Sequence, residues 1–542
     1  MMHSRFTRTL IGPLAGALLL AGCQDLSVPN ENNPSLDQAK LNPTNVEAQS
    51  GTSFKYMFSV MQSSDIRNGT TFYPGTALSC MGNEMTIGTT NLGRNQDTCL
   101  EPRMSMNNFD QGQWINRTPY QMLYGGIASA QDVLEATTKL NVKIGLPSSD
   151  RPQGIHTDRN IWWATFMIGV GNVYLGMLFD QSIPVKAGEP YAGGTDPSVF
   201  KPYAEAAALG ISTIRNAISL AEKAPEDTTP TNWVNLNLMP RGDVIKLMHS
   251  FIARGLAYTP RSPADRAKVD WNVVLGEVDL GITKDFTQQA DNTNVGTVSY
   301  YKQLVQLQTD ARPGIRLYGP ADTTGQYQAW LAKPIDQRAA ITIASPDKRI
   351  SNVNLATNGG VATAGAYFQY TSSSTQGTSL GNWILSSYRG VKFGVGTTNN
   401  YWQAGNLVLV SVTEMQLLKA EALIRLGRAG EAVPIINATR VANGKLPPID
   451  VNGPPQATDA QRASCVPRKD DGSCGNLMDA LIWESRLENF GLEGTIAWAN
   501  ARGWGTMLSG TVIHLPVPGR ELQTFKMQYY TFGGPNSPGT AP

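Results

Sequence analysis

Apolar residues recur at helical spacing in several long stretches of the chain, most clearly over residues 413–443. One helical face there carries Met415, Leu418, Ala422 and Leu426. Thr413 and Gln416 form a capping-box pattern at the start of this face, and Gly427 suits the left-handed residue that ends a helix. The spacing therefore predicts a helix that begins near residue 413 and ends near residue 426.

A second helix is predicted immediately afterwards, over residues 431–442, with Pro434 early in it, where a proline costs least. The two helices form a hairpin of about 31 residues, close to the length of a tetratricopeptide repeat. Similar pairs are predicted for residues 115–139 with 158–180 and for residues 202–223 with 241–258. Because pairs of this kind stack into a curved solenoid, the pattern predicts a mostly α fold of tetratricopeptide-like helical pairs.

Two stretches lack this pattern. Residues 63–110 are polar and predict loops, whereas residues 286–410 are rich in Gly, Ser, Thr, Asn and aromatic residues. We expect loops with a few short strands in the second stretch. The folded part is expected to be one domain over residues 46–542, helical over 46–285, loop-rich over 286–410, and helical and C-terminal over 411–542.

Residues 161–179 carry no charge between Arg159 and Asp180, and this run is long enough to span a bilayer. A membrane span and a buried helix are both open interpretations. The small residues Ala164, Gly169, Gly171 and Gly176 let helices approach closely. They favour the buried helix.

The N-terminus has the pattern of a lipoprotein signal peptide. Two arginines precede an apolar run of about a dozen residues, which is too short to cross a membrane. Leu20-Ala21-Gly22-Cys23 then resembles a bacterial lipobox, whose cysteine sulfur takes the lipid. The alternative is an ordinary signal peptide followed by a chance cysteine. We expect cleavage after residue 22, a lipid anchor on Cys23, and a polar, proline-containing tether over residues 23–45.

Four further cysteines fall into two local groups, which fits an oxidising compartment. Cys80 with Cys99 and Cys465 with Cys474 are the natural disulfide pairs, and both would staple loops. A zinc site is the alternative, but neither pair has CxxC spacing and the histidines are scattered. The sequence therefore predicts two disulfides, and it predicts neither a metal site nor a cofactor.

Length and charge narrow the class of protein. The chain has 542 residues, of which 41% are hydrophobic, so it can bury a large core. Its formal charge is +1, and losing the two positive charges of Arg5 and Arg8 with the signal peptide leaves −1. No basic run is present that could neutralise phosphates, which argues against nucleic acid as a partner.

Four segments of the chain resemble the SusD/RagB family of nutrient-uptake lipoproteins. The first resembles the family's helical pair at Glu414, Lys419, Ala420, Glu421, Gly427, Glu431, Ala432, Asn437 and Arg440. The second resembles the segment ending in Arg-x-Trp-Gly at Glu484, Arg486, Glu488, Gly494, Arg502, Trp504 and Gly505. The third resembles the closing proline motif at Leu515-Pro516-Val517-Pro518 with Glu521-Leu522. The fourth, residues 159–185, is similar to the family's long helix that leads into a Pro-containing loop.

The chain departs from the family pattern at one place. After the glycine near residue 494 the family commonly has Arg and then Asp-Leu, whereas this chain has Thr495-Ile496-Ala497-Trp498. The salt-bridge pattern of that segment is therefore not expected here. All four segments also have a purely structural interpretation as helix packing and capping, in which they mark no ligand site.

The resemblance implies a lipid-anchored outer-membrane protein that faces the cell exterior. It implies capture of an oligosaccharide, less often a peptide, and delivery to a SusC-like TonB-dependent transporter. Because sugar rings stack their apolar faces on aromatic side chains, loop aromatics are the candidate ligand-binding residues. These are Tyr73, Trp114, Tyr327, Trp330 and Trp383. The tryptophans on predicted helices are interpreted as packing residues, namely Trp162, Trp163, Trp483, Trp498 and Trp504.

Signals for catalysis are weak, and the sequence predicts a protein that is not an enzyme. Ser379 fits a Gly-x-Ser-x-Gly elbow with His514 as a candidate base, but a polar loop precedes it where an elbow needs a buried strand. Glu484 and Glu488 lie one helical turn apart, yet Arg486 between them favours a structural role over a glycosidase pair. A surface hydrolase and a tetratricopeptide-like envelope scaffold without a nutrient ligand are the alternative functions.

Overall fold

The computed structural model describes residues 39–62, 74–88, 98–109, 113–145, 153–189, 194–235, 237–291, 311–372, 380–393, 404–456, 464–534 and 537–542. Within these ranges helices dominate, and the strands are short and belong to sheets of two or three strands. The expectation of a mostly α fold with a few short strands is therefore confirmed. The signal peptide, Cys23 and most of the tether lie outside the described residues.

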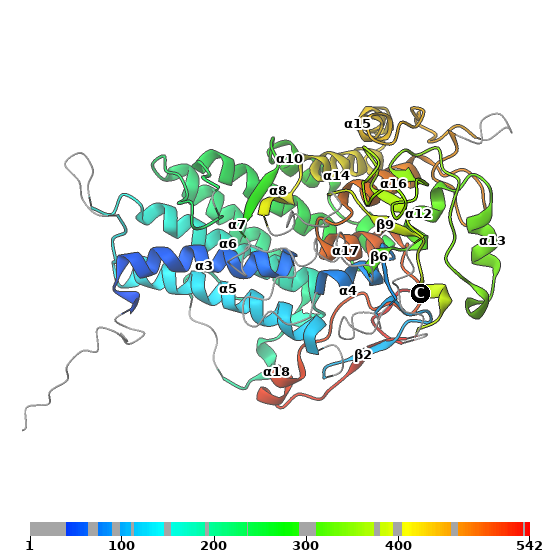
Figure 1. Cartoon of the computed structure of the whole chain (residues 1–542). Helices are drawn as coiled ribbons and strands as arrows, with labels where there is room; N and C mark the ends of the chain where they lie inside the picture. The colour runs from blue at the N-terminus through cyan, green and yellow to red at the C-terminus, as the bar shows by residue number, and fades with distance from the viewer. Residues whose placement is uncertain are drawn as a thin grey trace, which may run out of the picture.

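The N-terminal half is a bundle of long helices that lie side by side (Figure 1). They are α3 (Pro43–Gln62), α5 (Thr118–Leu134), α6 (Thr157–Leu178), α7 (Tyr203–Lys223), α8 (Arg241–Tyr258), the short α9 (Pro263–Ala267) and α10 (Trp271–Asp279). One π-helical turn, η2 (Gln113–Arg117), precedes α5, and another, η3 (Glu135–Lys139), follows it. Contacts of α5 with α6 and of α7 with α8 confirm the two helical pairs predicted in this half.

Helix α6 is the central helix of this half. It has the length and hydropathy of a membrane span, yet 94% of its most apolar window is buried inside the protein. Helix α7 approaches it closely at Gly176, where an added Cβ would lie 2.7 Å from the Ala207 nitrogen and the Tyr203 oxygen. The prediction of a buried helix with small contact residues is therefore confirmed.

The helical hairpin predicted near residue 413 is present with different ends. Its helices are α14 (Val412–Arg425) and α15 (Ala429–Ala442). The predicted capping box of Thr413 and Gln416 is wrong, because the helix begins earlier. Ser411 is the N-cap, and its hydroxyl accepts the Glu414 N–H at 2.9 Å.

The two stretches expected to be loops also contain short elements. Over residues 63–110 these are α4 (Pro74–Met81), β1 (Met85–Ile87) and β2 (Ser105–Asn107). Over residues 286–410 they are β5 (Phe286–Asp291), β6 (Ala311–Pro313), α12 (Ile315–Tyr318), η6 (Gly319–Ala321), α13 (Gln326–Ala332), η7 (Ile335–Gln337), β7 (Ile350–Ser351), β8 (Phe368–Tyr370), η8 (Asn382–Ile384), β9 (Tyr388–Gly390) and β10 (Ala404–Val410). The expectation of a polar loop is wrong for α4, whose residues are all buried and which contacts α17.

The remaining elements lie between the long helices and at the C-terminal end. They are β3 (Gln181–Ser182), η4 (Pro197–Val199), β4 (Lys201–Pro202), α16 (Leu477–Asn489), α17 (Gly494–Trp504), α18 (Gly519–Thr524) and β11 (Thr531–Gly533). Strand pairs join distant segments, since β1 pairs with β6, β2 with β11 and β5 with β10, all antiparallel. The C-terminal segment is thereby fastened to the N-terminal part of the chain.

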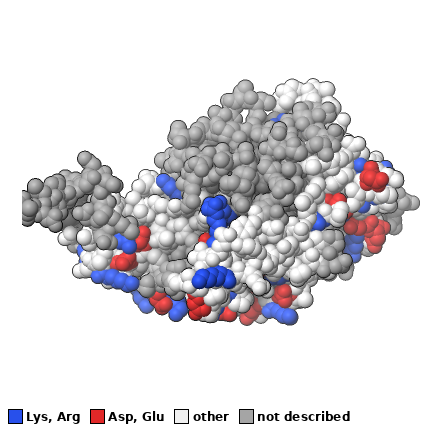
Figure 2. Space-filling model, turned by 90° about the horizontal axis from the view of Figure 1, so that it is seen from below, with Lys and Arg blue, Asp and Glu red and all other residues white. Residues whose placement is uncertain are grey.

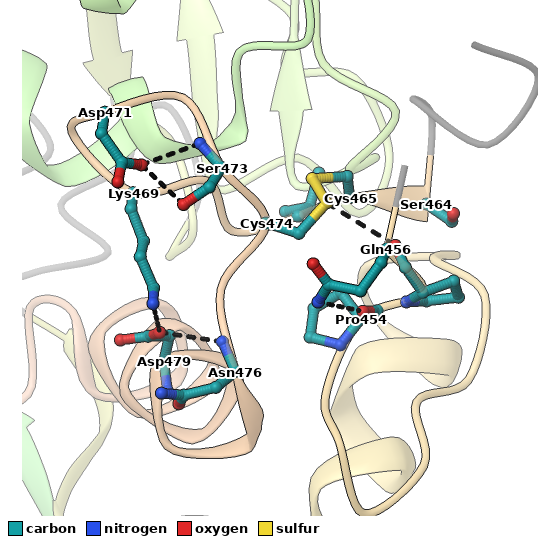
Figure 3. The surroundings of a disulfide bond; sticks show 12 residues. Pro454, Gln456, Ser464, Cys465, Lys469, Asp471, Ser473, Cys474, Asn476 and Asp479 are labelled. Carbon is teal, nitrogen blue, oxygen red and sulfur yellow. Dashed lines mark hydrogen bonds and ion pairs between the residues drawn. A yellow bond between two sulfur atoms is a disulfide. The ribbon is translucent and has the colours of Figure 1, made fainter. Parts of the chain in front are cut away.

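Both predicted disulfides are present. Cys80 bonds Cys99, and Cys465 bonds Cys474 across a nine-residue separation (Figure 3). The second bond closes a polar turn in which Asp471 accepts from Ser473, as expected for a stapled loop. The first differs from the prediction, because Cys80 lies on the buried helix α4 and only Cys99 lies in a loop.

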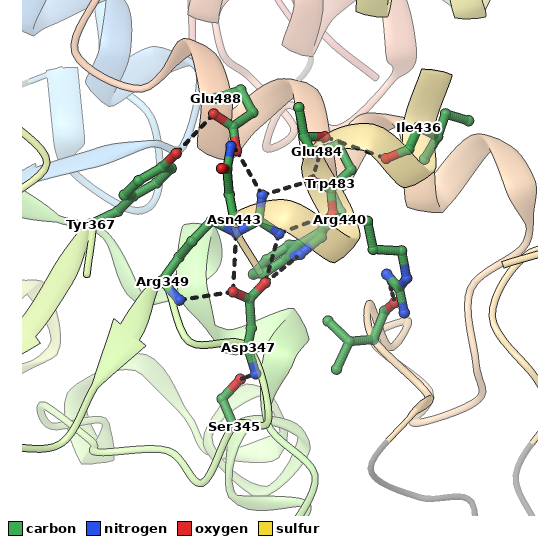
Figure 4. A network of polar contacts seen from close by, with 12 residues as sticks. Ser345, Asp347, Arg349, Tyr367, Ile436, Arg440, Asn443, Trp483, Glu484 and Glu488 are labelled. Atoms are coloured by element: carbon green, nitrogen blue, oxygen red, sulfur yellow. Dashed lines mark hydrogen bonds and ion pairs between the residues drawn. The ribbon is translucent and has the colours of Figure 1, made fainter. Parts of the chain in front are cut away.

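Buried arginines join the C-terminal helices to the rest of the molecule. Arg349 donates to Asp347 at 2.7 Å, to Glu484 at 2.6 Å and to Glu488 at 3.0 Å, and so links the β7 region to α16 (Figure 4). Its guanidinium is fully buried, as are the nearer carboxylates. The structural interpretation of the Glu484 and Glu488 pair is therefore confirmed, because both side chains bind an arginine.

Two further arginines act in the same way around α14. Arg254 on α8 donates to Glu414 at 2.5 Å and to Glu493 at 3.2 Å. Arg266 on α9 donates to Glu421 at 2.7 Å. Glu414, Glu421, Glu484 and Glu493 of the family-like segments thus hold helices together, as the structural interpretation of these residues predicts. Of the tryptophans predicted to pack, Trp162, Trp163, Trp483 and Trp498 are buried and Trp504 is half-buried.

Candidate functional site

The five aromatic residues predicted to bind ligand fall into three groups. Tyr73 lies outside the described residues, and so does the side chain of Trp114, whose backbone belongs to η2. Tyr327 and Trp330 lie on α13, and Trp383 lies on the 3-10 turn η8. The structure brings Trp330 and Trp383 together, because both residues line one cavity.

Tyr327 and Trp330 are core residues, which corrects the prediction that they are loop aromatics. Only 2% of Tyr327 and 5% of Trp330 is exposed, and the two rings stack with centroids 6.3 Å apart. The short helix α13 turns both rings inward, and neither its length nor its Gly-rich flanks reveal this in the sequence. Trp383 is half-buried and is therefore the aromatic residue that keeps an accessible surface.

Trp330 is held by two arginines that share one glutamate. The guanidinium carbons of Arg338 and Arg316 lie 4.6 Å and 5.6 Å from its ring centroid. Arg338 and Arg316 also donate to Glu101, at 3.2 Å and 3.1 Å. The indole N–H donates to the Ala339 carbonyl at 3.0 Å. This clamp fixes the wall of the site before any ligand binds.

Two adjoining cavities, of about 340 Å³ and about 50 Å³, meet at this wall. They share the lining residues Asn83, Arg316 and Leu508, and we call the two together the Arg316 cleft. The smaller cavity contains Trp330 and Trp383, and the larger one contains Tyr327. The volume of the larger cavity lies in the range of a small-ligand pocket.

Polar side chains line the larger cavity from both sides. Arg486 of α16 donates to the backbone carbonyls of Arg316 at 3.1 Å and Asn83 at 2.7 Å, so it holds two walls in place. Burial lowers the pKa of Arg486. Lys469 pairs with Asp479 at 3.7 Å, and Asp470 accepts from Tyr327 at 3.4 Å, and these residues also line the cavity. Donors and acceptors of both kinds therefore face the cavity beside an aromatic surface, which suits a polyhydroxylated ligand.

The candidate catalytic residues do not form a constellation in the described part of the chain. Ser379 lies outside it. Both ring nitrogens of His514 lack a hydrogen-bond partner there, and burial lowers the pKa of His514 to about 3. Among the described residues no group of three or more His, Cys, Asp or Glu side chains could hold a metal ion.

Surface charge does not single out one partner. On the face seen in Figure 2, Lys and Arg side chains alternate with Asp and Glu side chains along the rim of the described surface. Sequence reasoning missed Arg316, Glu101 and Arg338. Both arginines are near Trp330 in the sequence, but the glutamate that they share lies 215 and 237 residues away from them. Only Arg486 stood in a recognised motif.

Comparison with solved structures shows the fold. A SusD superfamily protein from Bacteroides vulgatus aligns with a TM-score of 0.53 at 12% identity, covering 90% of this chain and 97% of its own. One from Bacteroides fragilis aligns with a TM-score of 0.54 at 13% identity, covering 90% and 98%. A laminarin-binding SusD-like protein aligns with a TM-score of 0.50 at 14% identity, covering 92% and 99%.

The chain therefore has the SusD-like fold along nearly its whole described length, as the four family-like segments implied. No family model matches the sequence. No curated protein matches it either.

Proposed function

We propose that this chain is a cell-surface lipoprotein that binds nutrient oligosaccharides and delivers them to a SusC-like TonB-dependent transporter of the outer membrane. The observation that carries the proposal is the SusD-like fold, which includes the likeness to a laminarin-binding SusD-like protein over 92% of this chain. The Arg316 cleft adds a site of suitable chemistry. Trp383 offers a ring face, and the groups around Arg486 offer donors and acceptors for hydroxyls.

The same cleft favours a binding protein over a bare scaffold or a hydrolase. A scaffold of helical pairs needs no loop-rich region, whereas here that region builds one wall of a preformed cavity. A hydrolase needs a base in contact with a nucleophile. In the described residues His514 contacts the ring of Phe532, at a centroid distance of 4.5 Å, and hydrogen-bonds no hydroxyl.

Ligand binding is tested first with a glycan array and then by calorimetry on the array hits. Trp383→Ala is expected to weaken oligosaccharide binding by about 1–3 kcal/mol, because it removes the stacking surface. Trp383→Phe is the matched control and is expected to keep most of the affinity. Binding to peptides alone would replace the glycan by a peptide ligand, and ligand cleavage that is lost in Ser379→Ala would favour the hydrolase.

The anchor and the transporter need separate tests. Cys23→Ala is expected to abolish labelling with a radioactive fatty acid and to release the protein from the membrane, since the thiol takes the lipid. Mild detergent extraction of the native protein is expected to co-purify a TonB-dependent transporter. If no transporter co-purifies and no glycan or peptide binds, the envelope scaffold becomes the better interpretation.

A further inference from the structure

A second cavity, of about 580 Å³, lies on the opposite half of the molecule along α5. Its walls are α5 with η3, the loop that follows β3, and α18, which lies below α5 in Figure 1. We call it the α5 groove. It is lined by Tyr120, Gln121, Tyr124, Ile127, Ala128, Gln131, Asp132, Glu135, Lys139, Val185, Gly188, Glu189 and Glu521. The stripe from Tyr120 to Lys139 extends about 28 Å at the rise of a helix, so the groove suits a chain-like ligand.

The loop wall of the groove is fixed by Gln131. The side-chain amide of Gln131 donates to the carbonyls of Lys186 at 2.6 Å and Glu189 at 2.8 Å, and its oxygen accepts the Gly188 N–H at 2.8 Å. All three contacts hold the backbone of one short loop against α5. The groove is therefore formed without a ligand, and its loop carbonyls are already occupied.

Two tyrosines one helical turn apart form the floor. Tyr124 is half-buried, and its hydroxyl is tied to the Ile183 backbone, donating to the carbonyl at 2.9 Å and accepting the N–H at 2.8 Å. Tyr120 supports it from below, with ring centroids 4.7 Å apart, and packs edge-on against Phe179. With its hydroxyl engaged, Tyr124 contributes its ring to the lining of the groove.

One carboxylate beside this floor has no partner among the residues that the structure describes. Every other carboxylate in the four family-like segments accepts a hydrogen bond from a side chain: Asp180, Glu414, Glu421, Glu431, Glu484, Glu488 and Glu493. The side-chain carboxylate of Glu521, in the closing proline motif, accepts no hydrogen bond and forms no ion pair within the described part of the chain. Partial burial raises the pKa of Glu521, and no neighbouring cation offsets the effect.

The charges at the other end of the groove are largely satisfied within the protein. Lys40 bridges Asp132 at 3.1 Å and Glu135 at 2.6 Å. Lys186 pairs with Glu189 at 3.5 Å. The uncompensated negative charge of the groove is therefore the Glu521 carboxylate next to the tyrosine floor, with the half-buried Gln121 beside it.

We propose that the α5 groove is a second carbohydrate site that selects amino sugars, with a sugar ring stacked on Tyr124 and a protonated amine paired with Glu521. The sugar ring needs an aromatic face on which to stack, and the protonated amine needs an acceptor that is not already bonded to another protein group. Gln121 supplies a donor and an acceptor for a hydroxyl. The proposal shares with the proposed function only the carbohydrate class of the ligand, because none of the residues lining this groove lines the Arg316 cleft.

An extended peptide fits this groove less well. A peptide chain that lies along a protein surface needs backbone partners for its own N–H and C=O groups. The groove is walled by a helix, whose backbone groups bond each other, and by a loop whose carbonyls bind Gln131. Ring stacking with one charge contact does not need such partners.

The test compares two tetrasaccharides with the same β-1,4 backbone, one of glucosamine and one of glucose, by calorimetry on the mature chain. Glu521→Gln is expected to weaken binding of the glucosamine tetramer by about tenfold or more, since it removes a charge-assisted hydrogen bond, and to leave the glucose tetramer unchanged. Ala128→Trp, at an exposed lining position, is expected to abolish glucosamine binding by filling the groove. Trp383→Ala should not change the affinity for the glucosamine tetramer.

The outcomes separate the two sites. Equal affinity of wild type, Glu521→Gln and Ala128→Trp for the glucosamine tetramer would overturn the groove proposal, as would a wild-type protein that does not prefer the amine. Neutral glycan binding that depends on Trp383 would still support the proposed function in that case. If no neutral glycan binds at all, the proposed function fails, while the Glu521→Gln comparison still decides the groove. Melting curves of both variants confirm that they are folded.

Discussion

The two halves of this molecule are held together by different kinds of contact. In the N-terminal half, long helices pack through apolar faces and small residues, as α6 and α7 do around Gly176. Around the C-terminal helices, buried arginines join distant segments, as Arg349 joins the β7 region to α16, and as Arg254 and Arg266 join the helical half to α14. The first kind of contact depends on shape and volume. The second depends on each charge keeping its partner, because a broken buried pair leaves an uncompensated charge.

This difference has a consequence for the two cavities. The Arg316 cleft belongs to the region that ion pairs hold, and Arg316 and Arg338 help to fix its wall by binding Glu101. The α5 groove lies along the helical half, and uncharged side chains, those of Gln131, Tyr124 and Asn172, fix its loop. We therefore expect charge changes to disturb the cleft and volume changes to disturb the groove.

The strongest test of the contrast removes the charge of Arg349. Arg349→Met is expected to lower the free energy of unfolding by about 3–5 kcal/mol, because Asp347, Glu484 and Glu488 would remain buried without their cation. Denaturant unfolding of the mature chain measures this change. The matched control is Arg428→Met, which breaks the exposed pair with Glu431 and is expected to leave the free energy of unfolding nearly unchanged. Similar costs for the two variants would show that burial of the pair does not decide its strength.

The second test changes volume in the helical half. Gly176→Val is expected to cost about 3 kcal/mol, because its side chain would meet the backbone of α7 at Tyr203 and Ala207. Gly276→Ala on α10 is the control, since nothing lies within 4 Å of an added Cβ there. That control is expected to raise stability by about 0.5–1 kcal/mol through helix propensity. Loss of stability in both variants would point to a general effect of glycine replacement instead of the α6–α7 contact.

The same contrast explains which parts of the fold the sequence predicts. The ends of α7 and α8 agree with the periodicity to within a residue, because a long helix with one buried stripe repeats its signal over several turns. α13 has seven residues and α4 has eight, too few to show a period. The N-cap of α14 was predicted at Thr413 instead of Ser411, because both residue types are favoured at the N-cap. Only the backbone geometry distinguishes the two positions.

The ligand site was less predictable than the fold for a related reason. An aromatic residue in a Gly-rich stretch carries no local signal of its exposure, so Trp330 and Trp383 looked alike in the sequence. They differ because Arg316 and Arg338 come over the ring of Trp330 from outside its own helix. In the groove, the spacing of Tyr120 and Tyr124 on a predicted helix could have shown that they share a face. The missing partner of Glu521 could not be seen without the fold.

The smallest expected effect is a change of the free energy of unfolding with pH, which arises from buried carboxyl groups. Burial raises the pKa of Glu493, in the Arg254 network, from 4.5 to about 7, and burial raises that of Glu84 to about 7 as well. A carboxyl whose pKa is raised on folding binds more protons in the folded state, so its contribution to stability is lost as pH rises through the folded pKa. Between pH 6.5 and 8 the two groups together are expected to lower the free energy of unfolding by about 1–2 kcal/mol. Below pH 6.5 the buried, neutral His514 acts in the opposite direction.

Single variants assign this slope. Glu493→Gln keeps an oxygen that can accept from Tyr174 and leaves Arg254 paired with Glu414, so the protein is expected to stay folded and to lose less stability than wild type between pH 6.5 and 8. Glu84→Gln is expected to act in the same direction. Denaturant unfolding at several pH values measures both. Lys392, whose pKa burial lowers to about 8, offsets part of the wild-type loss near pH 8. An unchanged slope in both variants would show that these carboxyls do not titrate in this range, and the electrostatic contrast between the two halves would then rest on the ion pairs alone.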